Sequence, residues 1–412
     1  MDKFKTYRCS LCGKVYQPHE ATYTCPADGG NLDILLDYQG IKKAFSPEKI
    51  AASTEQSIWR YLPLLPVDDP GLQGTPLRSV GWTPVYQPKA LAEELRLEQL
   101  WLKDDGRNPT ASFKDRASSV VIARAREVKA DVVVTSSSGN AGAALAGMAA
   151  AARQKTVIFV PKAAPQAKVA QLIVFGARVF LVDGTYDDAF DLSLKAADEF
   201  GWYSRNTGFN PFTAEGKKTA AFEIWEQVIY KGNLKKPLNV IVPVGDGNII
   251  AGIHKGFKDL VELGWLEHMP QIYGIQPEGS AAIANAFNAG TEEIIPVKAD
   301  TLADSVSVDH PHDGLRALRA ATQTGGRYIT ISDQHILAAI ARLGREGIFI
   351  EPAAATAYAG LEAAVKQGLF DASDPVLVML TGSGLKDVKA AIQAVQPAPI
   401  VEPTLEALKK LL

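Results

Sequence analysis

From about residue 112 onward, short apolar runs alternate with segments that have a helical pattern. The runs are rich in valine and isoleucine, which is typical of strands buried on both faces. The predicted strands are Val132–Thr135, Val157–Val160, Val179–Val182, Val240–Val244, Ile272–Ile275 and Val376–Leu380. The predicted helices include Ser112–Lys129, Ala141–Arg153, Gln166–Phe175 and Asp187–Phe200. This alternation predicts an α/β fold with open, mostly parallel sheets and flanking helices.

The first 40 residues hold all three cysteines of the chain and are predicted to form a separate unit. Cys9 and Cys12 form one knuckle, and Cys25 begins a second one in which Asp28 stands where a zinc ribbon has its fourth cysteine. Three thiolates with an oxygen or imidazole ligand can hold zinc, so Asp28 completes the predicted metal site and His19 is the alternative. A degenerate ribbon without metal explains the same residues, and both interpretations stay open.

Length and charge restrict the class of protein. A chain of 412 residues is too long for one ordinary core. A formal net charge of -3 gives no electrostatic footprint for nucleic acid or an anionic membrane. The N-terminus lacks the apolar core of a signal peptide, and the Ala- and Gly-rich stretch 141–152 is too short to cross a bilayer. We therefore expect a cytoplasmic protein that binds neither nucleic acid nor membranes.

The stretch NPTASFKDR, residues 108–116, combines a turn with the start of a helix. Asn-Pro-Thr favours a turn, and Ser112 is placed to cap the helix that follows. Lys114 then falls in the first helical turn, where the helix dipole disfavours an ammonium ion and favours a nucleophilic amine.

Three glycine- and serine-rich loops follow predicted strands. They are SSSGN ending at Asn140, GDGN at residues 245–248, and TGSGLKD beginning at Thr381. Open α/β sheets bind ligands at the carboxyl ends of their strands, where helix N-termini attract phosphate groups. The second loop lacks the third glycine of a dinucleotide fingerprint, which argues against NAD.

Taken together and in this order, these stretches resemble those of the β-family (fold type II) of pyridoxal-phosphate (PLP) enzymes, and among them the threonine synthases. NPTASFKDR resembles the cofactor-lysine motif, SSSGN the loop beside the ring hydroxyl, GDGN the cofactor-phosphate loop and TGSGLKD the pyridine-nitrogen loop. NPFTAEGKKT resembles the substrate-domain segment, and the cysteine-bearing N-terminus resembles a zinc-ribbon-like extension of some members.

The resemblance implies a tryptophan synthase β-like architecture. Residues 1–40 would form the zinc-ribbon-like unit, residues 41–129 and 216–412 the large PLP-binding domain, and residues 130–215 a small mobile substrate domain. PLP would lie in the cleft between the two larger domains, and the protein would be a homodimer. The implied cofactor-binding residues are Lys114, Phe113, Asn140, Gly245, Asp246, Gly247, Asn248, Ile249 and Thr381, with Lys114 also the catalytic residue.

The implied reaction converts O-phospho-L-homoserine and water to L-threonine and phosphate by γ-elimination and β-addition. The substrate-binding residues are predicted to be Ser138, Lys168, Asn210 and Arg107. Two expected phosphate donors are missing, because Ala141 follows the loop asparagine and Thr213 stands where members often have arginine. Arg107 and Lys217 are the candidates to replace them, because the substrate phosphate needs cations.

Two alternatives remain. One is a related β-family reaction, such as serine or threonine dehydration or β-replacement on O-phosphoserine, which the missing donors favour. The other is a non-catalytic binding protein that keeps the fold, which the intact lysine, asparagine, glycine loop and threonine disfavour. Glu351, in a predicted strand-to-helix turn, either contacts the cofactor cleft or only shapes the turn.

Overall fold

The computed structural model describes residues 3–232 and 234–412. The strands are β1 (Phe4–Cys9), β2 (Val15–Tyr16), β3 (Leu32–Leu36), β4 (Val85–Tyr86), β5 (Leu100–Asp104), β6 (Val132–Ser136), β7 (Lys155–Pro161), β8 (Arg178–Val182), β9 (Tyr203–Ser204), β10 (Asn239–Pro243), β11 (Gln271–Pro277), β12 (Tyr328–Ile331) and β13 (Val376–Leu380). The α-helices are α1 (Tyr38–Ala44), α2 (Pro47–Ala51), α3 (Lys89–Glu94), α4 (Lys114–Glu127), α5 (Asn140–Ala152), α6 (Gln166–Val174), α7 (Tyr186–Phe200), α8 (Phe212–Lys217), α9 (Thr219–Ile224), α10 (Asn248–Glu262), α11 (Ala282–Ala289), α12 (Gly314–Thr322), α13 (Asp333–Gly344), α14 (Pro352–Lys366), α15 (Val388–Gln393) and α16 (Leu405–Lys409).

The larger sheet has the strand order β12-β11-β10-β13-β5-β4. Its strands pair in parallel except for β4, which runs antiparallel to β5. Two hydrophobic clusters cover its faces, one containing Val240 and Val242 of β10 and the other Ile241. This burial on both faces explains why β10 is a continuous apolar run. The α/β class with parallel sheets is confirmed, whereas β5 and β12 were not predicted.

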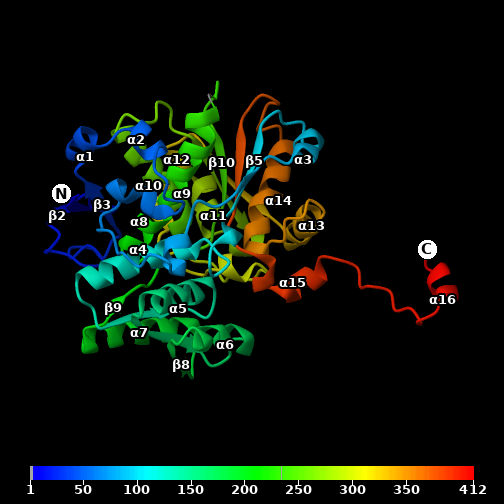
Figure 1. Cartoon of the computed structure of the whole chain (residues 1–412), viewed down its shortest axis with the longest axis horizontal. Coiled ribbons are helices and arrows are strands. Elements are labelled where there is room, and N and C mark those ends of the chain that lie inside the picture. The colour runs from blue at the N-terminus through cyan, green and yellow to red at the C-terminus, as the bar shows by residue number, and fades with distance from the viewer. Residues whose placement is uncertain (1–2, 233) are drawn as a thin grey trace.

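A second, four-stranded sheet with the order β8-β7-β6-β9 is parallel throughout. Its strands all come from residues 132–204, and helices α5, α6 and α7 pack around it at the lower end of the molecule in Figure 1. The carboxyl ends of β6 in this sheet and of β10 and β13 in the larger one lead into the three loops predicted to bind the cofactor. The small-domain boundaries at residues 130 and 215, and the mobility of that domain, stay predictions.

The N-terminal unit is a three-stranded antiparallel sheet with the order β2-β1-β3. It docks on the segment that follows β9. The Asn31 amide donates to the Gly208 carbonyl at 2.6 Å, and the Ser204 N–H donates to the Tyr23 hydroxyl at 2.9 Å. The Tyr23 ring also stacks on Phe209 with 4.6 Å between centroids. The cysteine-bearing unit thus supports the loop that enters helix α8.

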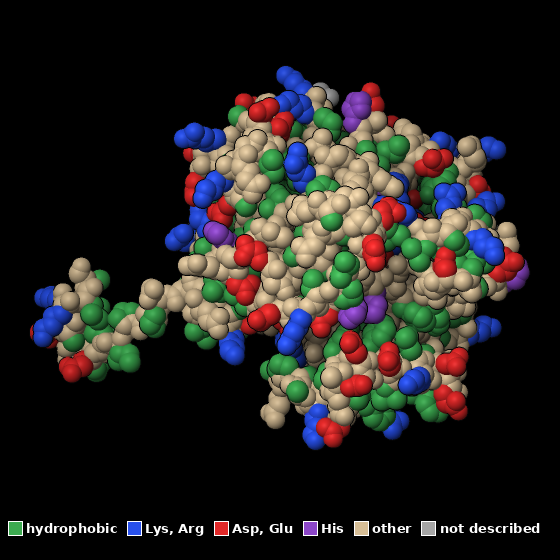
Figure 2. All heavy atoms as spheres, turned by 180° about the vertical axis from the view of Figure 1, so that it is seen from behind, with side chains coloured by type: hydrophobic (Ala, Val, Ile, Leu, Met, Phe, Trp, Pro, Cys, Tyr) green, Lys and Arg blue, Asp and Glu red, His purple; other side chains and the backbone are tan. Residues whose placement is uncertain are grey.

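The surface carries both signs of charge. Figure 2 shows lysine, arginine and carboxylate side chains interspersed over the visible face. Within the described residues, every helix is too short or too polar to cross a membrane. At the far end of the chain, α16 stands away from the body on an extended segment (Figure 1) and has no buried residue.

Helix α4 is fixed in the core by a buried ion network. The Arg116 Nε donates to Asp105 at 2.6 Å, and its Nη2 donates to Glu223 at 2.8 Å. The Lys103 ammonium meets the same Glu223 carboxylate at 2.7 Å, and all four side chains are fully buried. Removing one member would leave an uncompensated charge in a low-dielectric interior. The network therefore sets the position of the helix that begins at Lys114.

We predict that Glu223→Gln lowers the free energy of unfolding by ~3 kcal/mol or more, because Arg116 and Lys103 lose their shared counter-ion. The matched control is Glu292→Gln, since Glu292 is an exposed partner of Arg319 at 2.6 Å and such pairs contribute less than ~1 kcal/mol. Urea unfolding of both variants makes the comparison. Equal losses in the two variants would contradict the role of the network.

Candidate active site

The turn before Lys114 is held by a side chain that the sequence analysis did not assign. Asp115 accepts from the Thr110 N–H at 2.7 Å and from the Thr110 hydroxyl. Ala111 adopts a left-handed conformation with φ 63°, which closes the turn. The prediction that Ser112 caps the helix is wrong. Helix α4 has Phe113 at its N-cap without a side-chain bond, and the Ser112 hydroxyl has no partner among the described residues.

Backbone hydrogen bonds join the lysine turn to two other predicted site segments. The Phe113 N–H donates to the Thr381 carbonyl at 2.9 Å, and the Ser383 N–H donates to the Ala111 carbonyl at 3.1 Å. The Glu351 N–H donates to the Gly382 carbonyl at 3.1 Å. Residues that are more than 200 positions apart in the sequence are thus fixed around one point. Phe113 and Thr381 are both buried there.

Lys114 lies at the first position of α4, as predicted. Burial is the main cause that lowers the pKa of its amine, and Arg205 lowers it further, while Glu351 and Asp246 raise it. Among the described residues, no carboxylate lies within 4 Å of its Nζ to form an ion pair. A lysine whose neutral form is favoured in this way is suited to bind a carbonyl carbon covalently.

The GDGN loop leaves a phosphate cradle at the start of α10. Gly247 has φ +94°, and a Cβ there would lie 2.7 Å from the Asp313 carbonyl oxygen. A Cβ on Gly245 would lie 2.7 Å from the Val306 Cα, so only glycine fits at either position. No side chain caps this helix, which leaves its N-terminal amides for an anion. Lys114 and this loop together fit pyridoxal phosphate, which needs an amine and a phosphate site.

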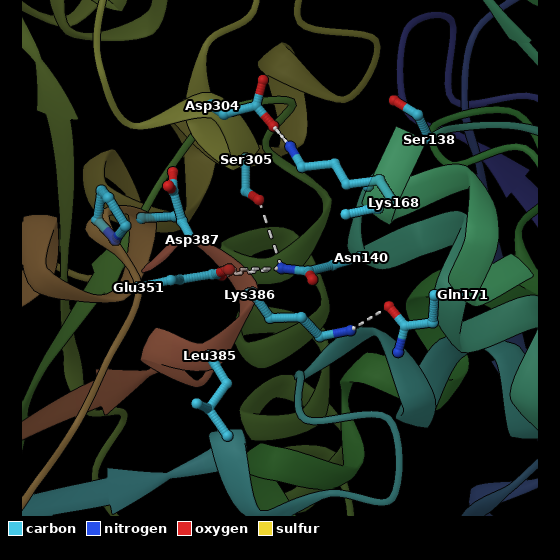
Figure 3. Close-up of a pocket in the computed structure, with 14 residues that line it drawn as sticks. Ser138, Asn140, Lys168, Gln171, Asp304, Ser305, Glu351, Leu385, Lys386 and Asp387 are labelled. Atoms are coloured by element: carbon cyan, nitrogen blue, oxygen red, sulfur yellow. Dashed lines mark hydrogen bonds and ion pairs between the residues drawn. The ribbon is translucent and has the colours of Figure 1, made fainter. Parts of the chain in front are cut away.

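A cavity of about 130 Å³ opens between the two larger sheets, lined by Ser138, Asn140, Lys168 and Glu351 among other residues. Figure 3 shows Asn140 pointing toward Glu351 across it, and the Asn140 amide donates to both carboxylate oxygens at 2.9 Å. Burial raises the pKa of Glu351, which Lys114 and the Asn140 hydrogen bond oppose. Glu351 thus belongs to the cleft, which answers the alternative left open by the sequence.

Polar contacts span the mouth of this cavity (Figure 3). Lys168 of α6 forms an ion pair with Asp304 at 2.6 Å, and Lys386 donates to Gln171 of α6 at 3.2 Å. Each contact links α6, which packs on the four-stranded sheet, to a loop of the part that contains the six-stranded sheet. Lys386 was not assigned as a site residue, although it lies within the TGSGLKD motif that would have indicated it.

Two predicted substrate-binding residues are not brought to the cavity. Arg107 is exposed at the end of the short turn after β5, because that turn directs it to solvent. Both polar groups of the Asn210 side chain serve the local backbone: its amide donates to the Ser204 carbonyl at 2.7 Å and its oxygen accepts from the Phe212 N–H at 2.9 Å. Ser138 and Lys168 do line the cavity.

Within the part of the chain that the structure describes, two buried cations lie near Lys114, and of these only Lys217 was considered from the sequence. Lys217 donates to the Asn248 side chain at 2.6 Å beside the glycine loop. Arg205 is fully buried and donates to Thr207 at 2.6 Å and to Ser118 at 3.2 Å. Nothing in the sequence singled out Arg205, because one arginine before an asparagine has no spacing that indicates burial.

The N-terminal unit brings Cys9, Cys12, Cys25 and Asp28 together, with ligand atoms all within 4.8 Å of one another. The Cys12 and Cys25 sulfurs are 3.9 Å apart, and the Cys9 sulfur is 3.3 Å from Asp28 Oδ1. A tetrahedral zinc ion with Zn–S bonds of about 2.3 Å places its sulfurs about 3.8 Å apart. The four side chains therefore fit zinc, whereas His19 is exposed and outside this group.

If this group holds zinc, the purified protein should contain about one zinc ion per chain. We expect Cys25→Ser to lose most of the metal and to lower the melting temperature by several degrees, because the ligands then no longer tie the knuckles together. Elemental analysis and a thermal melt measure both effects. His19→Ala is the control and should leave the metal content unchanged. A wild-type protein without metal, or equal metal in Cys25→Ser, would contradict the assignment.

Comparison with known proteins agrees with this geometry. The family model described as "Pyridoxal-phosphate dependent enzyme" matches residues 77–382. A threonine synthase of Methanocaldococcus jannaschii is 39% identical over 408 residues, covering 98% of each chain. A threonine synthase of Methanosarcina acetivorans is 35% identical over 406 residues, covering 98% of this chain and 97% of the relative.

Solved structures show the same fold at lower identity. Threonine deaminase isoform 2 from Solanum lycopersicum superposes with a TM-score of 0.67 at 22% identity, covering 82% of this chain and 88% of that one. Diaminopropionate ammonia lyase from Escherichia coli gives a TM-score of 0.65 at 20% identity, covering 76% of this chain and 87% of that one. By its length-wide similarity, the chain belongs to the pyridoxal-phosphate dependent enzyme family and, within it, to the threonine synthases.

Proposed function

We propose that the protein is a PLP-dependent lyase that converts O-phospho-L-homoserine and water to L-threonine and phosphate. The observation that carries this proposal is the half-buried Lys114, whose amine has a lowered pKa, near an uncapped glycine loop, in a chain similar over 98% of its length to a threonine synthase. The substrate would be a small amino-acid phosphate. A cytoplasmic location stays a prediction from the N-terminal sequence.

Each predicted cofactor-binding residue of the cleft would make a particular contact with PLP. Lys114 would carry it covalently, Phe113 would pack beside it, and residues 245–249 would hold its phosphate through main-chain amides. Asn140 would donate to the ring hydroxyl and Thr381 would meet the pyridine nitrogen. The cofactor, when bound, supplies an electron sink for a carbanion at Cα of the substrate.

Side chains of the protein would transfer protons and adjust the electronic properties of the cofactor ring. The Lys114 amine, whose pKa is lowered by burial, would take protons from Cα and Cβ and would deliver protons to Cγ, after phosphate has left it, and back to Cα. Thr381 would present a hydroxyl rather than a carboxylate to the ring nitrogen, so it would not enforce a protonated ring. A ring of this kind would be a moderated electron sink, which would favour elimination and replacement over transamination.

Closure of the cleft would exclude bulk water. The contacts between Lys168 and Asp304 and between Lys386 and Gln171 link its two sides near the mouth. We propose that these contacts break to admit substrate and form again over it, with residues 130–215 moving as the small domain. Such closure protects reactive intermediates from every water molecule except the one that adds to Cβ.

The holoprotein should release threonine and phosphate in equal amounts from O-phosphohomoserine. Chromatography of amino acids and a colorimetric phosphate assay follow both products, and Lys114→Ala is the control that should release neither. Serine, threonine and O-phosphoserine are assayed in parallel. If keto acid forms from serine or threonine, or O-phosphoserine is consumed, while phosphohomoserine stays intact, the related β-family reaction replaces this proposal.

We also propose that the protein is a homodimer in which the C-terminal arm contacts a second copy. Helix α16 and its flanks expose Leu405 at 70% and Leu412 at 98%, which is costly for an arm that remains in water. Light scattering after size exclusion should give a dimer for the full chain and a smaller mass for a chain ending at residue 394. A monomeric full chain would contradict the dimer, and a dimer that survives truncation would contradict the role of the arm.

A further inference from the structure

Buried cations in this protein are almost all paired with carboxylates. The buried lysines and arginines that have a carboxylate oxygen within 4.0 Å are Arg60, Lys103, Arg116, Lys218, Lys255 and Arg316. Among the described residues, Arg205 and Lys217 are buried without such a partner, at 0% and 2% exposure. An unpaired buried cation is costly, so its presence indicates an anion that is bound only part of the time.

The Arg205 guanidinium is held in place with one edge left open. Its Nη1 donates to the Thr207 hydroxyl at 2.6 Å and its Nε to the Ser118 hydroxyl at 3.2 Å. Its Nη2 is buried and has no partner among the described residues. Ser118 lies one turn after Lys114 on α4, so the open edge belongs to the surroundings of the reactive amine.

Lys217 is oriented by a series of hydrogen bonds that runs through the start of α10. It donates to Asn248 Oδ1 at 2.6 Å, and Asn248 donates to Asp313 at 2.6 Å. Arg316 neutralises that Asp313 at 2.6 Å, so the carboxylate has little charge left for Lys217. Asp313 is fully buried, as is the Asn248 side chain that it holds.

The three cations are close enough to act on one another. Burial is the main cause that lowers the pKa of Arg205, to about 10. The pKa of Lys217 lies well below its usual value, first through burial and then through Arg205 and Lys114. Asp246 is the carboxylate that attracts all three, and its Oδ2 is itself buried without a partner. An anion bound here would therefore offset the mutual repulsion of the three groups in their charged forms.

The two phosphate donors expected from the family are absent from this chain. Ala141 has no polar side chain, and the Thr213 hydroxyl already donates to the Asn210 carbonyl at 2.7 Å. Arg205 and Thr213 lie in one continuous segment that leads from β9 into α8. A cation eight positions earlier in that segment can therefore take over the function of the missing arginine.

We propose that Arg205 and Lys217 bind the phosphate of the substrate, replacing the donors lost at Ala141 and Thr213. The inference rests on the proposed function and names the residues that select a phosphorylated substrate. The cofactor phosphate does not need them, because the glycine amides and the N-terminus of α10 already provide its site. Arg205 offers a planar pair of donors that suits a phosphate, and Lys217 adds a point charge.

The experiment compares wild-type holoenzyme with Arg205→Gln and Lys217→Gln. Loss of a charge-assisted contact to phosphate should raise KM for phosphohomoserine by about 10- to 100-fold and change kcat less. The constant for competitive inhibition by inorganic phosphate should rise in parallel. Affinity for PLP, from absorbance titration of the apoprotein, should change less than about twofold because the glycine loop is intact. Arg126→Gln, at an exposed position of α4, is the control for loss of one positive charge.

A measurement that does not depend on turnover tests phosphate binding separately from the proposed reaction. Inorganic phosphate should raise the melting temperature of wild-type holoenzyme but not that of either variant. Both variants should fold, because each removes an unpaired buried charge, and Arg205→Lys should retain part of the effect. Weaker PLP binding with unchanged inhibition by phosphate would assign the cations to the cofactor and overturn the proposal. Unchanged phosphate binding would also overturn it. Phosphate binding that depends on Arg205, in a protein that leaves phosphohomoserine intact, would support the subsite and reject the reaction.

Discussion

The buried pairing of Arg116 with Asp105 and Glu223 is the constraint on which the site depends. Arg116 lies two residues after Lys114 in the same helix, so whatever fixes the guanidinium also fixes the amine. Glu223 brings in helix α9, and Asp105 brings in the end of β5. The network is costly to bury but costlier to break, which gives the helix one position rather than several. The helix that carries the Lys114 amine is therefore held rigidly.

The loops predicted to bind the cofactor come from both of the larger sheets. Loops after β10 and β13 of the larger sheet carry the glycine cradle and Thr381, whereas the loop after β6 of the smaller sheet carries Asn140. A ligand that contacts all of them must lie where the carboxyl ends of strands from both sheets meet. The N-terminal unit supports the same place from outside, through Tyr23 and Asn31 on the segment around Gly208. The two sheets thus form one cleft, and the N-terminal unit supports it.

The sequence predicted the features that depend on local pattern. The strands β6 and β10 were found because they are continuous apolar runs. Strand β5 was missed because LWLKD contains two charged residues, and Lys103 is buried only because Glu223 arrives from a helix 120 positions later to meet its charge. For the same reason, the sequence could not show that Arg205 is a better candidate for the site than Arg107. Both are single arginines near motif residues, and only burial, which depends on tertiary structure, distinguishes the exposed Arg107 from the buried Arg205.

In the proposed reaction, phosphate leaves from one carbon of the substrate and water adds to a different carbon. The most direct measurement is the reaction of phosphohomoserine in water enriched in oxygen-18, with mass spectrometry of both products. We expect the heavy oxygen in the hydroxyl group of threonine and none in the phosphate, because the C–O bond of the phosphate ester breaks. Heavy oxygen in the phosphate, with homoserine as the other product, would mean simple hydrolysis of the ester and would contradict the proposed reaction.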